Sequence, residues 1–357
     1  MTPGRTIEDI LNLAVWAPSG DNCQPWRFEV YDNKIDIFNV PDKDKALYNF
    51  RQSGSMVAHG ALIENIFIIT SQLGYEVRPS FPPAKEKNNL VASLTLTESK
   101  PKEEPLYNFI KVRTTNRKPY KKHYLSPEIK ENLLNSVIGE GGVVLIEDEK
   151  QKHLLGRSLS ANEQILFENA ALHKSFFSNV VWNKREEQEK KSGLYLKTLE
   201  LPPPARLAFH LFSSWNWLKF LNKLGLSRSV AKTNAKIYGS CAIMGAIITP
   251  SESDEDFIAA GRMMQKIWLK ATASGLGMQI MAGLPYLARR VFANQADMLS
   301  DTHHQMIRNH YSQIESIVDG KNKNIVLLFR IGDGGNPSAR SSRLPAEIKV
   351  IKPFVLK

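Results

Sequence analysis

The spacing of apolar residues along the 357-residue chain predicts helices alternating with strands. Apolar positions three and four residues apart indicate helices, and short apolar runs between turn formers indicate strands. The predicted helices are residues 6–16, 55–73, 127–137 and 256–274, with a further helical segment at 151–191. The predicted strands are residues 26–30, 34–40, 90–96, 143–146, 242–248 and 325–331. Long helices between strands of mixed spacing predict an α+β fold, arranged as an α/β sandwich.

Two segments interrupt this pattern. Residues 97–108 are charged, contain prolines and have few apolar side chains, so they predict a linker between residues 1–108 and 109–357. Residues 201–226 combine three consecutive prolines with an aromatic stretch, inside an insert at about 195–230. Three interpretations remain open for this insert: helices packed on the core, a mobile lid over a ligand, or a basic helix on a membrane surface.

The chain also contains an internal similarity. Residues 60–74 and 261–275, at an offset of 201, share glycine, isoleucine, aromatic and glycine at matching places. A short strand-like stretch follows each segment, at 75–78 and 278–281. The pattern predicts a tandem duplication, in which one chain imitates a symmetric dimer.

Composition limits the classes of protein. Hydrophobic content of 42% with 23% charged residues is that of a globular protein. Two cysteines, Cys23 and Cys241, are too few for a disulfide framework or a four-thiolate metal site. The N-terminus has no apolar signal region, and no uncharged apolar run approaches the length of a membrane span. We therefore expect a cytoplasmic protein. The net charge of +11 favours anionic partners without choosing among them.

The strongest local motif is Ala-Pro-Ser-Gly-Asp-Asn-Cys-Gln-Pro-Trp at residues 17–26. It offers a hydroxyl and amides beside a proline-fixed backbone, and such groups can hydrogen-bond a polar ligand edge. A rigid turn that joins helix to strand is the alternative interpretation. The candidate binding residues here are Pro18, Ser19, Gly20, Asn22 and Gln24.

Two basic motifs follow. The first, at residues 113–117, places two guanidinium groups and a hydroxyl within five positions, which suits a phosphate dianion. The second is a predicted strand ending in a glycine at 332, followed by the arginines at 340 and 343 before Leu-Pro. The candidate residues are Arg113, Thr114, Thr115, Asn116, Arg117, Arg340 and Arg343.

Together these motifs resemble those of the nitroreductase family, and the match looks closest to its tandem, single-chain subfamily. The resemblance covers most of the chain but is poor over residues 150–230. It implies a nitroreductase-like fold and bound FMN, with Ala282 and Gly283 near the flavin N5. Many family members have Glu-Gly at this pair, so Ala282 is a departure. The first half carries the Pro-Ser loop and the second half the phosphate motif, so the halves are expected to form one site as a pseudo-dimer.

The resemblance implies an FMN-dependent oxidoreductase that passes electrons from NAD(P)H to a nitroaromatic or quinone-like acceptor, with no catalytic side-chain acid or base. A flavin-binding or flavin-sequestering protein with little turnover is the alternative. We expect no nucleic-acid or membrane partner, because no nucleic-acid motif accompanies the positive charge. We also expect no metal site at His303, His304 and His310. Either a monomer or a homodimer is compatible with a duplicated chain.

Overall fold

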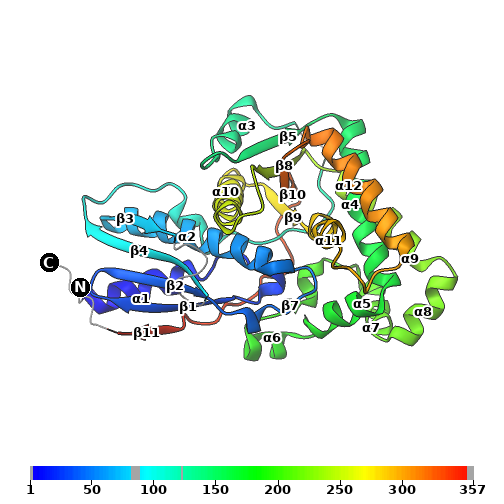
Figure 1. The fold of residues 1–357 in the computed structure, drawn as a ribbon, viewed down its shortest axis with the longest axis horizontal. Coiled ribbons are helices and arrows are strands. Elements are labelled where there is room, and N and C mark those ends of the chain that lie inside the picture. The colour runs from blue at the N-terminus through cyan, green and yellow to red at the C-terminus, as the bar shows by residue number, and fades with distance from the viewer. Residues whose placement is uncertain (1–2, 82–88, 122–123, 352–357) are drawn as a thin grey trace.

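The computed structural model describes residues 3–81, 89–121 and 124–351 and confirms the predicted α+β class (Figure 1). The first sheet has the strand order β11-β1-β2-β4-β3. Its strands are β1 (Trp26–Tyr31), β2 (Lys34–Asn39), β3 (Tyr75–Ser80), β4 (Leu90–Glu98) and β11 (Ile348–Val350). Neighbours pair antiparallel except β11, which lies parallel to β1. The C-terminal strand thus joins a sheet that is otherwise built from residues before 108.

The second sheet has the order β5-β8-β10-β9 and is antiparallel throughout. Its strands are β5 (Gly142–Ile146), β8 (Ile243–Thr249), β9 (Gly277–Met281) and β10 (Asn324–Gly332). Every residue of β8 and β10 is buried, which explains why both strands read as continuous apolar runs and not as alternating ones.

Two long helices pack against each other at the centre of the molecule: α2 (Ser53–Leu73) and α10 (Asp254–Ala273). They meet at Gly60 and Gly261, where a Cβ on either residue would collide with the backbone of the opposite helix. These glycines hold equivalent places in the internal similarity. By length and composition, Phe50–Leu73 is one stretch of the described chain that could cross a membrane, but 78% of its apolar window is buried, as in a core helix.

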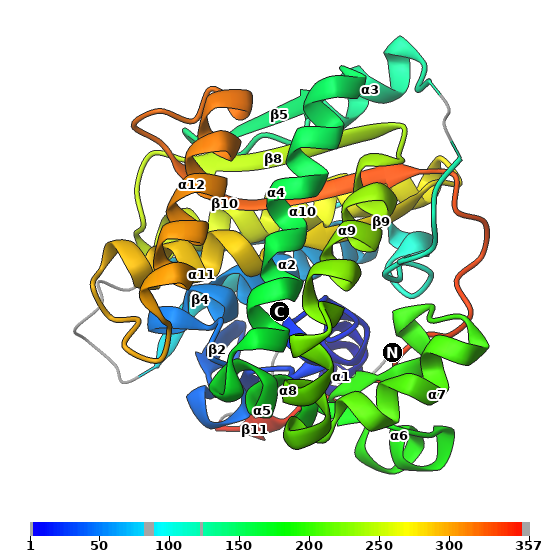
Figure 2. The ribbon, with the colours of Figure 1, turned by 90° about the vertical axis from the view of Figure 1, so that its right-hand side faces the viewer.

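Further helices surround this centre. The second sheet packs with α4 (Glu149–Glu168), α9 (Leu226–Gly239), α11 (Gly283–Phe292) and α12 (Asp301–Val318) in a second apolar core (Figure 2). Helix α1 (Pro3–Ala14) packs on α2, and α3 (Pro127–Leu134) packs on α10. The described chain also contains five short 3-10 turns: Gly20–Asn22, Pro41–Lys43, Phe50–Gln52, Tyr107–Phe109 and Leu196–Leu199.

The prediction that residues 151–191 are helical is wrong in part, because a strand and two helix starts interrupt the segment. After α4, Asn169 caps a separate helix, α5 (Ala170–Ser178), and a short strand, β6 (Val180–Val181), precedes α6 (Lys184–Lys190). Strand β6 pairs parallel with β7 (Leu194–Tyr195). The break arises because Asn169 and Asn183 each use their side chains to cap a new helix start.

The aromatic insert forms two helices, α7 (Pro203–Phe212) and α8 (Trp215–Lys223). Their inner faces pack on α5, where Phe209 lies 5.0 Å from Phe177 and Trp215 lies 5.2 Å from His173, measured between ring centroids. The inner faces of α7 and α8 therefore agree with the interpretation of helices packed on the core. No residue of 201–226 lines the two clefts described below, whereas Thr198, at the start of the wider insert, lines the first of them.

Candidate functional site

The Pro-Ser loop after α1 has an unusual backbone. Asp21, Asn22 and Gln24 all have positive φ, at 45°, 59° and 52°. Such conformations are costly for residues other than glycine, least so for Asn and Asp, and persist where surrounding contacts hold them. The Ser19 hydroxyl accepts from the Gln24 backbone N–H at 3.0 Å. The loop is therefore a strained, fixed turn that presents the Asn22 side chain from a set position.

Gln24 holds this loop in place and does not line the cleft beside it. Its Nε2 donates to the carbonyl of Lys191 at 2.8 Å, and its Oε1 accepts from the backbone N–H of Leu344 at 2.9 Å. Asn22 Nδ2 adds bonds to the carbonyls of Lys191 and Ser342. These contacts join the N-terminal loop to the end of α6 and to the C-terminal basic segment.

Three arginines, Arg113, Arg340 and Arg343, gather beside the loop. Arg113 is buried, donates from Nη2 to the Trp16 carbonyl at 2.8 Å and stacks 4.4 Å from the Trp268 ring. Burial, together with repulsion from Arg343 and Arg340, lowers the pKa of Arg113 well below its usual value. Burial and the nearby Arg340 lower the pKa of Arg343 to about 10. Such repulsion is relieved by a bound anion.

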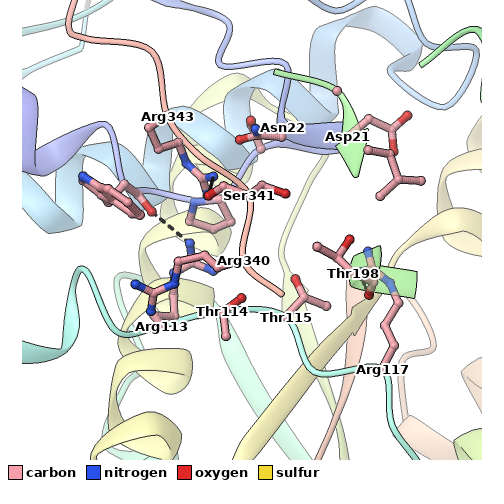
Figure 3. Close-up of a pocket in the computed structure, with 15 residues that line it drawn as sticks. Asp21, Asn22, Arg113, Thr114, Thr115, Arg117, Thr198, Arg340, Ser341 and Arg343 are labelled. Atoms are coloured by element: carbon pink, nitrogen blue, oxygen red, sulfur yellow. Dashed lines mark hydrogen bonds between the residues drawn. The ribbon is translucent and has the colours of Figure 1, made fainter. Parts of the chain in front are cut away.

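A cleft lies between the loop and these arginines (Figure 3). It encloses about 590 Å³, part of which is open to solvent. Its lining residues are Trp16, Pro18, Ser19, Asp21, Asn22, Arg113, Thr114, Thr115, Arg117, Gly193, Leu194, Thr198, Arg340, Ser341 and Arg343. Asp21 is the one carboxylate among these described residues, and it lies on the side of Arg117, away from the three arginines. The arginine end of the cleft is thus suited to an anion.

Nine of the residues predicted from the motifs line this cleft: Pro18, Ser19, Asn22, Arg113, Thr114, Thr115, Arg117, Arg340 and Arg343. Arg117 donates to the Thr198 carbonyl at 3.0 Å, which ties it to the 3-10 turn after β7. Sequence reasoning did not select the other lining residues: Trp16, Asp21, Gly193, Leu194, Thr198 and Ser341. Trp16, Asp21 and Ser341 adjoin the motifs, whereas residues 193–198 carry no motif that would have identified them.

The remaining predicted residues lie outside the cleft. Asn116 is buried and donates to the Gly335 carbonyl at 2.8 Å, while its backbone N–H bonds Met278 in β9. It therefore holds the basic segment against the second sheet. Gly20 lines a neighbouring cleft of about 980 Å³, which shares Asp21 and Gly193 with the first cleft.

Ala282 and Gly283 open α11 beside a group of half-buried polar side chains. A Cβ on Gly283 would lie 2.5 Å from the side chain of Asn162. Oδ1 of Asn162 and Oε2 of Glu163 are buried without a hydrogen-bond partner among the described residues, and the hydroxyl of Tyr48 lies beside the Asn162 side chain. Tyr238 donates to the other carboxylate oxygen of Glu163 at 2.9 Å. Burial raises the pKa of Glu163 to about 7.

This raised pKa predicts a pH-dependent effect of Glu163→Gln. The folded protein holds the Glu163 proton more tightly than the unfolded chain does. Protonated Glu163 therefore adds to the free energy of unfolding at low pH, and this addition is lost as pH rises through about 7. Glutamine cannot ionise. We therefore expect the Tm of Glu163→Gln, relative to wild type, to increase between about pH 5 and about pH 8. Thermal unfolding across this range measures it. The exposed Glu128→Gln is the control, and a Glu163→Gln difference that stays constant with pH would contradict the prediction.

The three histidines noted in the sequence lie on α12, and each contacts a different residue outside that helix. His303 lies 3.2 Å from the Glu168 carboxylate, His304 contacts the Ala296 carbonyl, and His310 contacts the Ser158 hydroxyl. Within residues 3–81, 89–121 and 124–351, no three metal-ligating side chains come together.

Comparison with known proteins gives the family. The model of the Nitroreductase family matches residues 2–306. The chain is 24% identical to an uncharacterized protein of Mycobacterium tuberculosis over 347 residues, which cover 96% of this chain and 47% of that protein. It is also 24% identical to the probable NAD(P)H nitroreductase PigM of a Serratia species over 288 residues, 76% of this chain and 78% of the relative. The chain thus spans about half the length of the mycobacterial relative.

Among solved structures, the chain is similar to a nitroreductase with bound FMN from Bacteroides fragilis, with a TM-score of 0.36, 9% identity, and coverage of 68% of this chain and 95% of that one. It is also similar to the FMN-dependent nitroreductase NfnB of Mycobacterium smegmatis in complex with NADPH, with a TM-score of 0.36, 12% identity, and coverage of 67% and 94%. The family model extends across most of this sequence, and the chain therefore belongs to the nitroreductase family.

Proposed function

We propose that this chain binds FMN in the cleft of Figure 3 and acts as an oxidoreductase, with NAD(P)H as electron donor and a nitroaromatic or quinone-like acceptor. The observation that carries the proposal is the convergence of Arg113, Arg340 and Arg343 on one end of a cleft whose other wall is the Pro-Ser loop. Family membership and the names of relatives such as the probable NAD(P)H nitroreductase support the same activity.

The donor set fits a flavin phosphate. Nε of Arg113 and Nε of Arg343 are buried without a hydrogen-bond partner among the described residues, and so is Oδ1 of Asn22. Buried polar groups are ordinarily paired, so unpaired donors and acceptors around one cleft point to a ligand that pairs them. Guanidinium groups bind phosphate oxygens through charge-assisted hydrogen bonds. The three arginines would hold the phosphate.

The other lining residues would contact the rest of the cofactor. Ser19, Asn22 and Thr115 offer hydroxyl and amide groups for polar atoms of the ring, and Arg117 offers a positive charge against a reduced, anionic ring. Bound FMN would supply hydride acceptance and electron transfer, while the protein binds and orients it. We place Ala282 and Gly283, with the half-buried Asn162 and Glu163 beside them, on the ring side of the site.

We further propose that residues 1–108 and 109–357 are two halves that form this single site as a pseudo-dimer. In support, the equivalent glycines Gly60 and Gly261 meet where α2 crosses α10. One turn further along the two helices, Gln265 of α10 donates from Nε2 to Oδ1 of Asn65 on α2 at 2.7 Å. The loop residues come from the first half and the arginines from the second. The C-terminal strand β11 then reaches back to pair with the first half.

The absorption spectrum of the purified protein tests the proposed function. We expect bound flavin, and bleaching of its absorbance within seconds of anaerobic mixing with NADPH, because a reducible flavin in an open cleft can accept hydride. The flavin released when the protein is denatured and removed by centrifugation provides the reference spectrum of free flavin. Flavin that stays oxidised in the presence of both NADH and NADPH would instead indicate a flavin-sequestering protein. Protein that neither contains nor takes up FMN would refute the site itself.

A further inference from the structure

The segment that contains α7, α8 and α9 has an unusual charge. Residues 201–251 include six lysines and arginines and no aspartate or glutamate. The whole chain has 36 acidic residues in 357, so a segment of this length would contain roughly five at average composition. Along the sequence the nearest acids are Glu200 and Glu252, at the two boundaries, and in space Glu163 and Glu168 of α4 bond to Tyr238 and Ser227 on the inner side of α9. The segment is therefore selectively basic, and its surface favours an anionic partner.

The outward faces of α7 and α8 are apolar as well as basic. Leu207 and Leu211 lie four residues apart on α7, and Trp217, Phe220 and Leu224 follow helical spacing on α8 and its end. Their exposed fractions are 74% for Leu207, 56% for Leu211, 58% for Trp217, 54% for Phe220 and 73% for Leu224. The opposite faces are already used, because Phe209 and Leu218 are buried. Exposed apolar residues gathered in this way mark an interaction surface.

The basic side chains of α8 and of the adjoining helix α9 are exposed. Exposed on α8 and α9 are Lys219, Lys223, Arg228, Lys232 and Lys236. None of them forms an ion pair within the part of the chain that the structure describes, whereas surface lysines elsewhere, such as Lys130 and Lys190, pair with glutamates. Figure 1 places α7 and α8 at the right-hand edge of the molecule, and Figure 2 turns this side toward the viewer, with α8 in the foreground.

We propose that the outward faces of α7 and α8 bind the surface of an anionic lipid bilayer. The aromatic and leucine side chains would enter the boundary between headgroups and acyl chains, while the lysines and arginines contact anionic headgroups. Tryptophan is favoured at that depth because its ring is apolar and its N–H is polar. The proposal departs from the expectation of no membrane partner, and it does not depend on the proposed redox activity. A peripheral site of this kind needs no membrane-spanning helix.

Cosedimentation of the full chain with vesicles tests this proposal. We expect binding to vesicles of equal parts phosphatidylcholine and phosphatidylglycerol, and loss of most of that binding at high salt or on pure phosphatidylcholine. Reversing two charges with Lys219→Glu and Lys223→Glu should weaken binding about tenfold or more. Trp217→Ser with Phe220→Ser should also release the protein, by removing inserted apolar surface. Because these side chains are exposed, both variants should keep wild-type thermal stability.

Matched variants elsewhere complete the design. Lys321→Glu with Lys323→Glu makes the same charge change at two exposed lysines, and Tyr124→Ser with Val137→Ser removes exposed apolar side chains remote from α8 in sequence. These variants should bind vesicles nearly as well as wild type. The proposal is overturned if folded wild-type protein does not sediment with anionic vesicles, or if the α8 variants bind as well as the controls. The proposal is also overturned if this surface instead joins two copies of the chain. In that case the α8 variants would convert a wild-type dimer into a monomer, and neither the dimer nor the monomer would bind vesicles.

Discussion

Protein carrying Arg113→Ala together with Arg343→Ala is expected to purify without flavin. Arg113 is buried and Arg343 half-buried at one end of the cleft, and each has a buried Nε without a partner among the described residues. A hydrogen bond to a charged group contributes about 1.5–3 kcal/mol, so losing two such groups should cost about 3–6 kcal/mol of binding free energy. That is a loss of FMN affinity of roughly a hundredfold to ten-thousandfold. Titration of the stripped protein with FMN, followed by fluorescence quenching, measures it.

Two comparisons separate loss of the site from loss of the fold. Arg113 also bonds the Trp16 carbonyl and stacks on Trp268, so the variant needs an unfolding curve beside its FMN titration. Arg113→Lys with Arg343→Lys keeps both charges but removes the forked geometry, and should recover part of the affinity. Arg78→Ala with Lys321→Ala removes two exposed charges and should leave FMN affinity unchanged. A double alanine variant that is folded and fully occupied by flavin would rule out the phosphate assignment.

The elements that sequence predicted well are those with long, uninterrupted patterns. The helices near 55–73 and 256–274 were predicted because a buried helix of this length repeats its apolar positions many times. Strand β11 is only three residues long and half exposed, so its existence depends on a partner strand more than 300 positions away. A local pattern carries no such information.

The site shows the same division between local and tertiary signals. Residues inside the two basic motifs and the Pro-Ser loop line the cleft because short segments keep neighbouring side chains together. Gly193, Leu194 and Thr198 line it only because the strand pair β6–β7 brings that stretch across the loop. Residue type also does not distinguish a side chain that faces a ligand from one that holds the backbone. Gln24 and Asn116 belong to the motifs, yet both bond to main-chain groups outside the cleft.

Substituting alanine for Gly60 or Gly261 is expected to destabilise the whole fold. A Cβ on Gly60 would overlap the Ile258 carbonyl oxygen, and one on Gly261 would overlap the Val57 carbonyl oxygen. These are backbone atoms of rigid helices, so the helices must move apart and give up packing along their contact. Overpacking of this kind costs about 1–3 kcal/mol, and the backbone contact places these substitutions at the upper end of that range. Urea unfolding monitored by circular dichroism gives the free energy of each variant.

The double variant makes the test specific to the helix crossing. If one added methyl group already pushes α2 and α10 apart, the second methyl group finds space between them. The loss of unfolding free energy in Gly60→Ala with Gly261→Ala should therefore be clearly smaller than the sum of the two single losses. Gly275→Ala supplies a control: its Cβ meets nothing within 4 Å, and only its φ of 72° opposes the change, for which we expect about 1 kcal/mol. Its cost should simply add to that of Gly60→Ala. Small, additive effects at both Gly60 and Gly261 would mean that the two helices do not meet at these glycines.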